Sequence, residues 1–246
     1  MKILGVETGE SGSRAREERG QLGHLLERNA ALRRVFAGTP GLQARLAELQ
    51  KWQSGRLLRS HADLRANPRY RRAVEFFFEE LYGGGDPSLR DRDLLRVQRV
   101  MEKLLPSEAL RALCLAIELE ILSQELDAEI TRGLSPGPIT DESYAEAYRR
   151  AGRRDDRERQ IALLHMIGGY LDHVVRKPIV GALVRVARGP AHAAGFGSLQ
   201  EFLERGLRAF EAMQGAGEFL GAIRDRETRA MERVFSGTPD PFEFGT

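Results

Sequence analysis

Residues 107–132 read SEALRALCLAIELEILSQELDAEITR and give the strongest indication of the fold. Drawn with the 3.6-residue period of an α-helix, their apolar side chains form two bands rather than one. The two bands are Leu110, Leu113, Cys114, Ile117 and Ile121, and Leu119, Leu122, Leu126 and Ile130. A helix with apolar residues on so much of its circumference packs on several sides. We therefore predict that residues 107–132 form the central helix of an all-α protein.

Two polar stripes separate these apolar bands. We expect the first stripe to face solvent; it consists of Arg111, Glu118, Glu125 and Glu129. We expect the second stripe, on the opposite side of the helix, to be partly buried; it consists of Glu120, Ser123, Gln124 and Asp127. A buried carboxylate needs a partner or takes up a proton. Under one interpretation, arginines such as Arg90 or Arg92 pair with the second stripe. Under the other, Glu120, Ser123 and Asp127 line a ligand-binding site.

The rest of the chain also shows helical periodicity, without an alternating strand pattern. The predicted helices cover residues 14–36, 42–66, 69–82, 91–104, 140–150, 155–176, 178–189, 198–213 and 216–235. Glycines and prolines separate them, so the connections are mostly short. The fold class is thus all-α, a single bundle of about eight to ten helices. Residues 1–41 are expected to be a flexible segment (1–13) and a peripheral helix, and residues 42–246 the bundle, with a seam at 133–140.

Composition excludes several classes of protein. The 246 residues are 41% hydrophobic and 30% charged, and no apolar run reaches the ~18 residues of a membrane span. Lysine and arginine number 38 against 36 acidic residues, and the two signs alternate along the chain, so nucleic-acid binding is the weakest hypothesis. The single cysteine, Cys114, excludes an internal disulfide and a cysteine-based metal cluster. The N-terminal apolar stretch is too short for a signal peptide, which favours a cytoplasmic location.

His61 lies on the apolar side of the predicted helix 42–66, between Leu57 and Leu64. Such a histidine is either a core residue with a satisfied ring nitrogen, or a haem or metal ligand, or a general base oriented by Asp63. The metal-binding motifs Glu-x-x-His and His-Glu-x-x-His are absent, as are a Walker loop and Gly-x-Ser-x-Gly. The sequence therefore predicts no catalytic residues and no metal ligands, and leaves the cofactor open.

An aromatic run, Phe76 to Phe78, precedes Tyr82 on the predicted helix 69–82. These rings either pack in the core or form an apolar ligand pocket beneath Tyr82. Further along, Gly168 and Gly169 are expected to allow close packing of the helix 155–176 against a neighbour.

Several motifs together resemble a known family. They are Trp52-Gln53, Arg56-Leu57, His61-Ala62-Asp63-Leu64, Asn67-Pro68-Arg69-Tyr70, Phe76-Phe77-Phe78-Glu79-Glu80-Leu81-Tyr82-Gly83, Arg90-Asp91-Arg92-Asp93-Leu94, Glu118-Leu119, Leu122-Ser123, Leu126-Asp127, Gln200-Glu201-Phe202-Leu203-Glu204 and Arg226-Glu227. Over residues 42–236 the chain resembles an uncharacterised family of proteobacterial proteins with an FFxxxLYG motif followed by RDxDL. The resemblance implies an all-helical bacterial protein and no particular reaction.

These observations favour a non-catalytic protein that binds a small apolar ligand or a protein partner. Homodimerisation through a helix face is compatible with the pattern, which does not determine it. The candidate ligand-binding residues are His61, Tyr82, Glu120, Ser123 and Asp127. The alternative is a haem- or metal-dependent enzyme or redox protein that uses His61 with core carboxylates.

Overall fold

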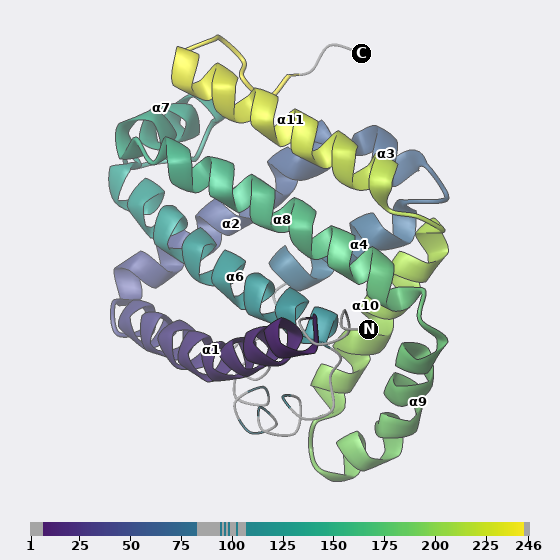
Figure 1. The fold of residues 1–246 in the computed structure, drawn as a ribbon. Coiled ribbons are helices and arrows are strands. Elements are labelled where there is room, and N and C mark those ends of the chain that lie inside the picture. Colours follow the sequence, from purple (N-terminus) through teal and green to yellow (C-terminus); the bar gives the residue numbers. More distant parts are fainter. Residues whose placement is uncertain are drawn as a thin grey trace.

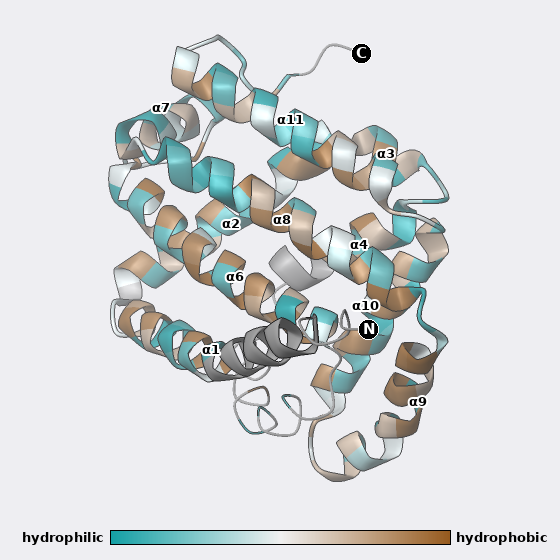
Figure 2. Ribbon diagram, viewed as in Figure 1, coloured by the Kyte–Doolittle hydropathy of each residue, from teal (hydrophilic) through white to brown (hydrophobic). Residues whose placement is uncertain are grey.

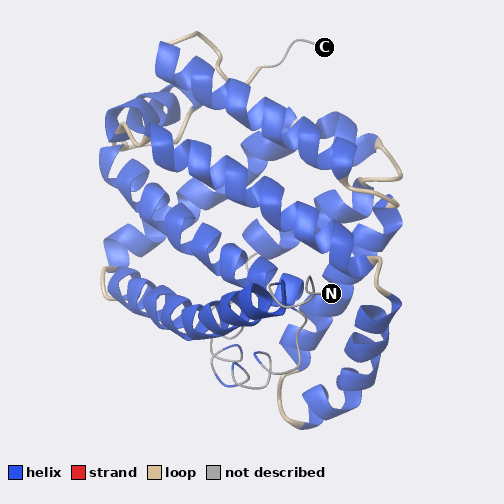
Figure 3. Ribbon diagram, in the orientation of Figure 1, coloured by secondary structure: helices blue, strands red, loops and turns tan. Residues whose placement is uncertain are grey.

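The computed structural model describes residues 7–82 and 107–243, together with Leu94, Arg96, Gln98 and Glu102; side chains are described from Gln21 onward, except at Pro40 and residues 78–82. These described residues form ten α-helices and no strand (Figures 1 and 3). The prediction of an all-α bundle is confirmed. Within the same residues, no helix is long and apolar enough to cross a membrane.

The helices follow one another with mostly short connections. They are α1 (Glu7–Ala37), α2 (Pro40–Ser60), α3 (Ala62–Ala66), α4 (Arg71–Tyr82), α6 (Ser107–Gly133), α7 (Asp141–Ala151), α8 (Arg154–Val175), α9 (Pro178–Ala193), α10 (Gly197–Met213) and α11 (Gly217–Ser236). Leu94, Arg96, Gln98 and Glu102 are helical, and the remainder of the predicted helix 91–104 lies outside the described residues.

Helix α6 has the central position expected from its sequence. It packs against α1, α2, α7 and α8, and Figure 1 shows α6, α8 and α11 as successive diagonal rods, with α1 below them. Both apolar bands of α6 supply buried residues, among them Leu110, Ile121, Leu126 and Ile130. Cys114 is also buried, on the side of α6 that meets α1. In Figure 2 the hydrophobic colouring of α6 recurs around the helix, which fits burial on several sides.

The predicted helix 42–66 is interrupted at His61. Helix α2 ends at Ser60, and α3 begins at Ala62, because His61 adopts φ −124° and ψ 27°. The Ser60 carbonyl accepts a hydrogen bond from Arg226 Nη1 of α11 at 3.1 Å. The break therefore lies where a side chain from the far end of the chain satisfies the backbone of the last helical turn.

Two further boundaries differ from the predictions. Helix α1 begins at Glu7, so residues 7–13 are helical where we expected a flexible segment. Helix α9 continues through Pro190 to Ala193, where we expected it to end near residue 189. The proline nitrogen donates no bond, but the Ala194 nitrogen, four residues on, donates to the Pro190 carbonyl at 3.0 Å and closes the last turn. The division of the chain at residue 41 stays a proposal.

Helices α8 and α11 approach each other at a glycine. A Cβ atom on Gly168 would lie 2.8 Å from Leu220 Cδ1 of α11, whereas one on Gly169 would meet nothing within 4 Å. The predicted role in close helix packing is thus confirmed for Gly168 and wrong for Gly169, whose Cα faces open space.

Candidate functional site: a buried polar network between α2, α6, α8 and α11

A largely buried carboxylate on α11, that of Glu227, joins Arg56 of α2 to His61, which stands between α2 and α3. Both carboxylate oxygens of Glu227 lie 2.7 Å from Arg56 Nη1. Oε1 of the same carboxylate lies 3.0 Å from Nε2 of His61. The side chains of Arg56 and His61 are 9% and 6% exposed, so this is a dry ion pair rather than a surface one. Burial would raise the pKa of Glu227, but the charge of Arg56 and the hydrogen bond from His61 outweigh it and hold the pKa at about 2.

Arg226, which precedes Glu227 in the chain, lies against the other ring nitrogen of His61. Its Nη1 and Nη2 donate to the two oxygens of Asp63 at 2.6 and 2.7 Å. Nη1 also lies 3.5 Å from Nδ1 of His61. This arrangement assigns the proton to Nε2, which donates to Glu227, and leaves Nδ1 as the acceptor. The hydrogen bond and charge of Arg226 lower the pKa of Asp63 to about 2.

A second part of the network surrounds Asp127 of α6. Gln53 Nε2 of α2 donates to Asp127 Oδ1 at 2.8 Å, and both side chains are buried. Burial raises the pKa of Asp127, and the charge of Arg157 and the Gln53 hydrogen bond oppose that rise. Arg157 and Asp127 nevertheless form no ion pair within 4.0 Å in the described part of the chain.

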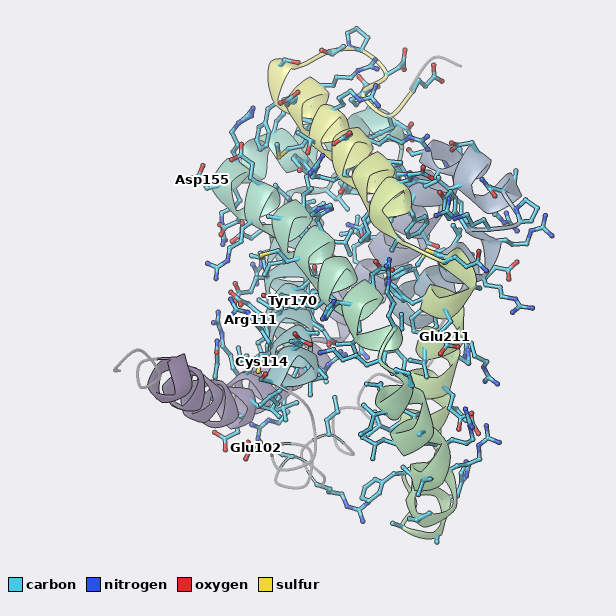
Figure 4. The ribbon with its side chains drawn as sticks, turned by 45° about the vertical axis from the view of Figure 1, so that its right-hand side comes forward. Glu102, Arg111, Cys114, Asp155, Tyr170 and Glu211 are labelled. Atoms are coloured by element: carbon cyan, nitrogen blue, oxygen red, sulfur yellow. The ribbon has the colours of Figure 1, made fainter. Side chains whose placement is uncertain are left out.

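Arg157 lies in the first turns of α8 and is itself buried, with 6% of its surface exposed. Its Nη1 donates to Oε1 of Gln160 at 3.0 Å, and Gln160 Nε2 donates to Ser123 Oγ at 2.7 Å. The guanidinium carbon lies 4.5 Å from the ring centroid of Tyr148. Its Nη2 is buried and has no hydrogen-bond partner among the described residues. Figure 4 places Asp155, two residues earlier, at the exposed start of the same helix.

A partly enclosed cavity of about 60 Å³ lies between these two parts of the network. The polar residues that line it are Arg56, Tyr144, Tyr148, Arg157, Gln160 and Glu227, and the apolar ones are Ile161, Ala230, Met231, Val234 and Phe242. One water needs on the order of 10–15 Å³ of such space, so the cavity has room for a few waters or one small ligand. Its position joins α2, α7, α8 and α11 with the segment after α11.

Aromatic rings hold this cavity in shape. Trp52 and Tyr144 have ring centroids 4.3 Å apart, and Phe242 lies 5.7 Å from Tyr144. The guanidinium carbon of Arg56 lies 5.2 Å from the Phe242 ring centroid, as Arg157 lies against Tyr148. Each buried guanidinium is therefore placed against the face of a ring, a contact that favours a cation.

The candidate residues taken from the sequence do not form one cluster. His61 contacts Glu227, Ser123 contacts Gln160, and Asp127 lies near Arg157, so these three surround the cavity from behind without lining it. Glu120 belongs to the same stripe of α6, two turns before Asp127, but it pairs with Arg33 of α1. The side chain of Tyr82 lies outside the described residues, as do the proposed partners Arg90 and Arg92.

The aromatic run before Tyr82 packs in the core where the structure describes it. Phe76 lies 5.4 Å from Phe202, and Phe77 lies 5.9 Å from Phe210 and 6.2 Å from Phe219, as distances between ring centroids. These rings join α4 to α10 and α11. The stripe expected to face solvent also makes contacts at its edges, since Arg111 lies 5.6 Å from the Tyr170 ring centroid (Figure 4).

The geometry does not favour His61 as a haem or metal ligand. Both ring nitrogens are within hydrogen-bond distance of Arg226 and Glu227, so a metal would have to displace one of them. Across residues 7–82 and 107–243, His, Cys, Asp and Glu form no group of three or more that could hold a metal ion.

Sequence reasoning missed Arg56, Arg157, Tyr144, Tyr148 and Glu227. Arg157 stands in a run of alternating charges, Arg153 to Arg159, a pattern typical of a solvated helix face. A usable signal was the pair Tyr144 and Tyr148, spaced i and i+4 on one face of a short helix. A second signal was the resemblance, because its motifs include both Arg56 and Glu227.

These observations define an all-helical bundle with a buried polar network and an adjoining cavity. Residues 33–241 match the model of the family described as a domain of unknown function, DUF8198. The protein belongs to this family, and the expectation of an uncharacterised family is confirmed. No curated protein and no solved structure was found to be similar to the chain.

Proposed function

We propose that the protein is a non-catalytic binding module whose small ligand occupies the cavity between α2, α7, α8 and α11. The observation that supports this most strongly is Arg157, a buried cation that lines the cavity and contacts no carboxylate among the described residues. A buried charge is costly unless it is paired or hydrogen-bonded on all sides. A ligand in the cavity would supply the missing partner.

The supporting residues favour binding over turnover. Glu227 is fully engaged by Arg56 and His61, and its low pKa makes it a poor general base near neutral pH. His61 stands behind Glu227 and does not line the cavity. The network therefore fixes the positions of charges around the cavity, as expected for a preorganised binding site.

A screen with a matched pair of variants tests this proposal. Thermal unfolding of the wild type is measured against a panel of neutral, cationic and anionic small molecules, and native mass spectrometry follows any mass retained from purification. Ala230→Leu adds bulk to the cavity wall, because Ala230 is buried and lines the cavity, while Ala162→Leu adds the same bulk to the exposed side of α8. We expect a ligand that stabilises the wild type and Ala162→Leu but not Ala230→Leu. No stabilising compound and a bare chain mass, or equal binding by folded Ala230→Leu, would contradict the proposal.

The finer expectations from the sequence form part of the same proposal. We infer a bacterial, cytoplasmic protein that shares the FFxxxLYG motif with proteobacterial relatives and associates as a homodimer through a helix face. Light scattering after size exclusion tests the last point: twice the chain mass would support a dimer, and the chain mass would contradict it.

A further inference from the structure

The charge of Arg157 is the starting point for the chemical class of the ligand. Among the described residues, the guanidinium donates to the side-chain oxygen of Gln160 and lies against the ring face of Tyr148. Neither partner is an anion, and Nη2 is buried without a hydrogen bond to any described residue. A guanidinium presents a planar set of donors that matches the two oxygens of a carboxylate. The cation therefore lacks a partner of the kind for which its geometry is suited.

The acidic residues nearby do not supply that partner. Glu227 lines the cavity, but both of its oxygens lie 2.7 Å from Arg56 Nη1 and one also contacts His61. Asp127 lies behind the wall, where Gln53 binds it and burial favours its neutral form. Arg56 and Glu227 cancel each other, which leaves the cavity with the positive charge of Arg157.

The lining of the cavity combines two kinds of side chain. Arg157, Tyr144 and Tyr148 are polar, whereas Ile161, Met231 and Val234 are apolar. A bare inorganic oxyanion would leave the apolar side chains without a partner, and a purely apolar molecule would leave Arg157 without one. A volume of about 60 Å³ limits the ligand to a few non-hydrogen atoms.

We infer that the cavity binds a short-chain carboxylate, with the carboxylate on Arg157 and the hydrocarbon chain against Ile161, Met231 and Val234. This inference rests on the proposed function, since it names the ligand of the same cavity. Buried Arg–carboxylate contacts are charge-assisted and often use two parallel hydrogen bonds, so they discriminate strongly against a neutral analogue. Tyr144 and Tyr148 also line the cavity, and a tyrosine hydroxyl can donate a further hydrogen bond to a carboxylate.

Calorimetric titration of the full chain with butyrate, butyramide and inorganic phosphate, at constant ionic strength, tests the inference. Butyramide has nearly the shape of butyrate without its charge, and phosphate has charge without the apolar chain. We expect butyrate to bind the wild type at least about tenfold more tightly than either of the other two. This comparison needs no variant, so it does not depend on how a mutant folds.

Two arginines of α8 then provide a matched pair. Arg157→Gln removes the charge at the cavity, and Arg159→Gln removes one that is 61% exposed and pairs with Glu118 on the surface. We expect butyrate binding to weaken by roughly tenfold to a hundredfold in the first variant and to be unchanged in the second. Equal weakening in both would mean a general charge effect and would overturn the inference.

The outcomes separate the inference from the proposed function. Equal binding of butyrate and butyramide, or tighter binding of phosphate, would overturn the carboxylate while leaving a ligand in the cavity. If none of the three binds but another compound stabilises the wild type and not Ala230→Leu, the carboxylate inference also fails while the proposed function stands. If no compound of any class binds, both the inference and the proposed function fail.

Discussion

Nε2 of His61 lies 3.0 Å from Oε1 of Glu227, although 166 positions separate the two residues in the chain. The contact joins the break between α2 and α3 to the middle of α11. Arg226 binds the same break through Asp63 and the Ser60 carbonyl. Two consecutive residues of α11 therefore fix the geometry of the α2–α3 junction, and one of them, Glu227, also holds Arg56 at the edge of the cavity.

Glu227→Gln should strongly destabilise the fold. The substitution keeps the shape of the side chain but leaves Arg56, which is 9% exposed, as an uncompensated buried charge. Removing one partner of a buried ion pair typically costs about 3–5 kcal/mol, and we expect about 3 kcal/mol in urea unfolding. Glu146→Gln is the control, because Glu146 pairs with Arg150 on the surface at 54% and 60% exposure and should cost at most about 1 kcal/mol. Equal losses in the two variants would refute a special role for the buried pair.

In the wild type, lowering the pH should remove the stabilisation that the pair of Arg56 and Glu227 contributes. The folded-state pKa of Glu227, about 2, is below its ordinary value of 4.5, so the folded state releases this proton more readily than the unfolded state. Its contribution to stability is therefore complete above about pH 4.5 and is lost as the pH falls towards 2. The difference in unfolding free energy between wild type and Glu227→Gln should shrink over this window. A difference that stays constant from pH 6 to pH 2.5 would contradict the assignment.

Periodicity was sufficient for the fold but not for the partners of the polar residues. It located α6 and predicted a partly buried polar stripe, because the spacing of apolar residues along a helix shows which of its sides are buried. It could not say that Glu120 faces Arg33 of α1, Ser123 faces Gln160 of α8, and Asp127 faces Gln53 of α2. Those pairings depend on which helix lies against each side of α6, and they join residues 37 to 87 positions apart.

Local patterns were misleading where distant contacts decide the structure. His61 fits the apolar face of a continuous helix 42–66, yet the helix breaks there because α11 satisfies the freed carbonyl of Ser60. Arg157 lies within a charged run typical of a solvated surface, yet α7 covers it with Tyr148. The motif resemblance carried information that periodicity lacks, since Gln53 and Asp127, Arg56 and Glu227, and Asp63 and Arg226 all form contacting pairs.

Asp127→Asn should affect stability with the opposite dependence on pH. Burial raises the folded-state pKa of Asp127, so the folded state holds this proton more tightly than the unfolded state. The contribution of Asp127 to wild-type stability therefore falls as the pH rises above its ordinary value of 3.8. Asparagine keeps an acceptor for Gln53 and does not titrate, so the stability of the variant relative to wild type should increase from pH 4 to pH 7. Urea unfolding of both proteins at pH 4 and pH 7 measures this difference. If the stability of Asp127→Asn relative to wild type decreased over this range, the charge of Arg157 would have a larger effect on the pKa of Asp127 than burial has.

Phe242→Ala should open the cavity from the C-terminal side. Phe242 is 8% exposed, lies against Trp52 and Tyr144, and covers the guanidinium of Arg56. Loss of a buried phenylalanine ring costs about 3–5 kcal/mol in a rigid core, and we expect about 3 kcal/mol because the segment after α11 can partly collapse into the space. Phe242→Leu, which retains an apolar side chain, should lose less than half as much. Ligand binding should weaken in Phe242→Ala. If this variant unfolded in urea with the stability of the wild type, the Phe242 ring would not be needed to hold this side of the cavity in place.

Adjacent glycines of α8 should respond to alanine with opposite signs. At Gly168 a Cβ atom would lie 2.8 Å from Leu220 Cδ1, and Leu220 is a buried side chain that has little room to move. Overpacking of this kind costs about 1–3 kcal/mol, so Gly168→Ala should be destabilised by about 2 kcal/mol. At Gly169 the same atom would meet nothing within 4 Å, and alanine in a helix is favoured over glycine by up to about 1 kcal/mol. Gly169→Ala should therefore be more stable than wild type, with both values measured by urea unfolding. Because the two substitutions share the same gain in helix propensity, the difference between them isolates the packing of α8 on α11, and two equal effects would show that the helices can separate at Gly168 without cost.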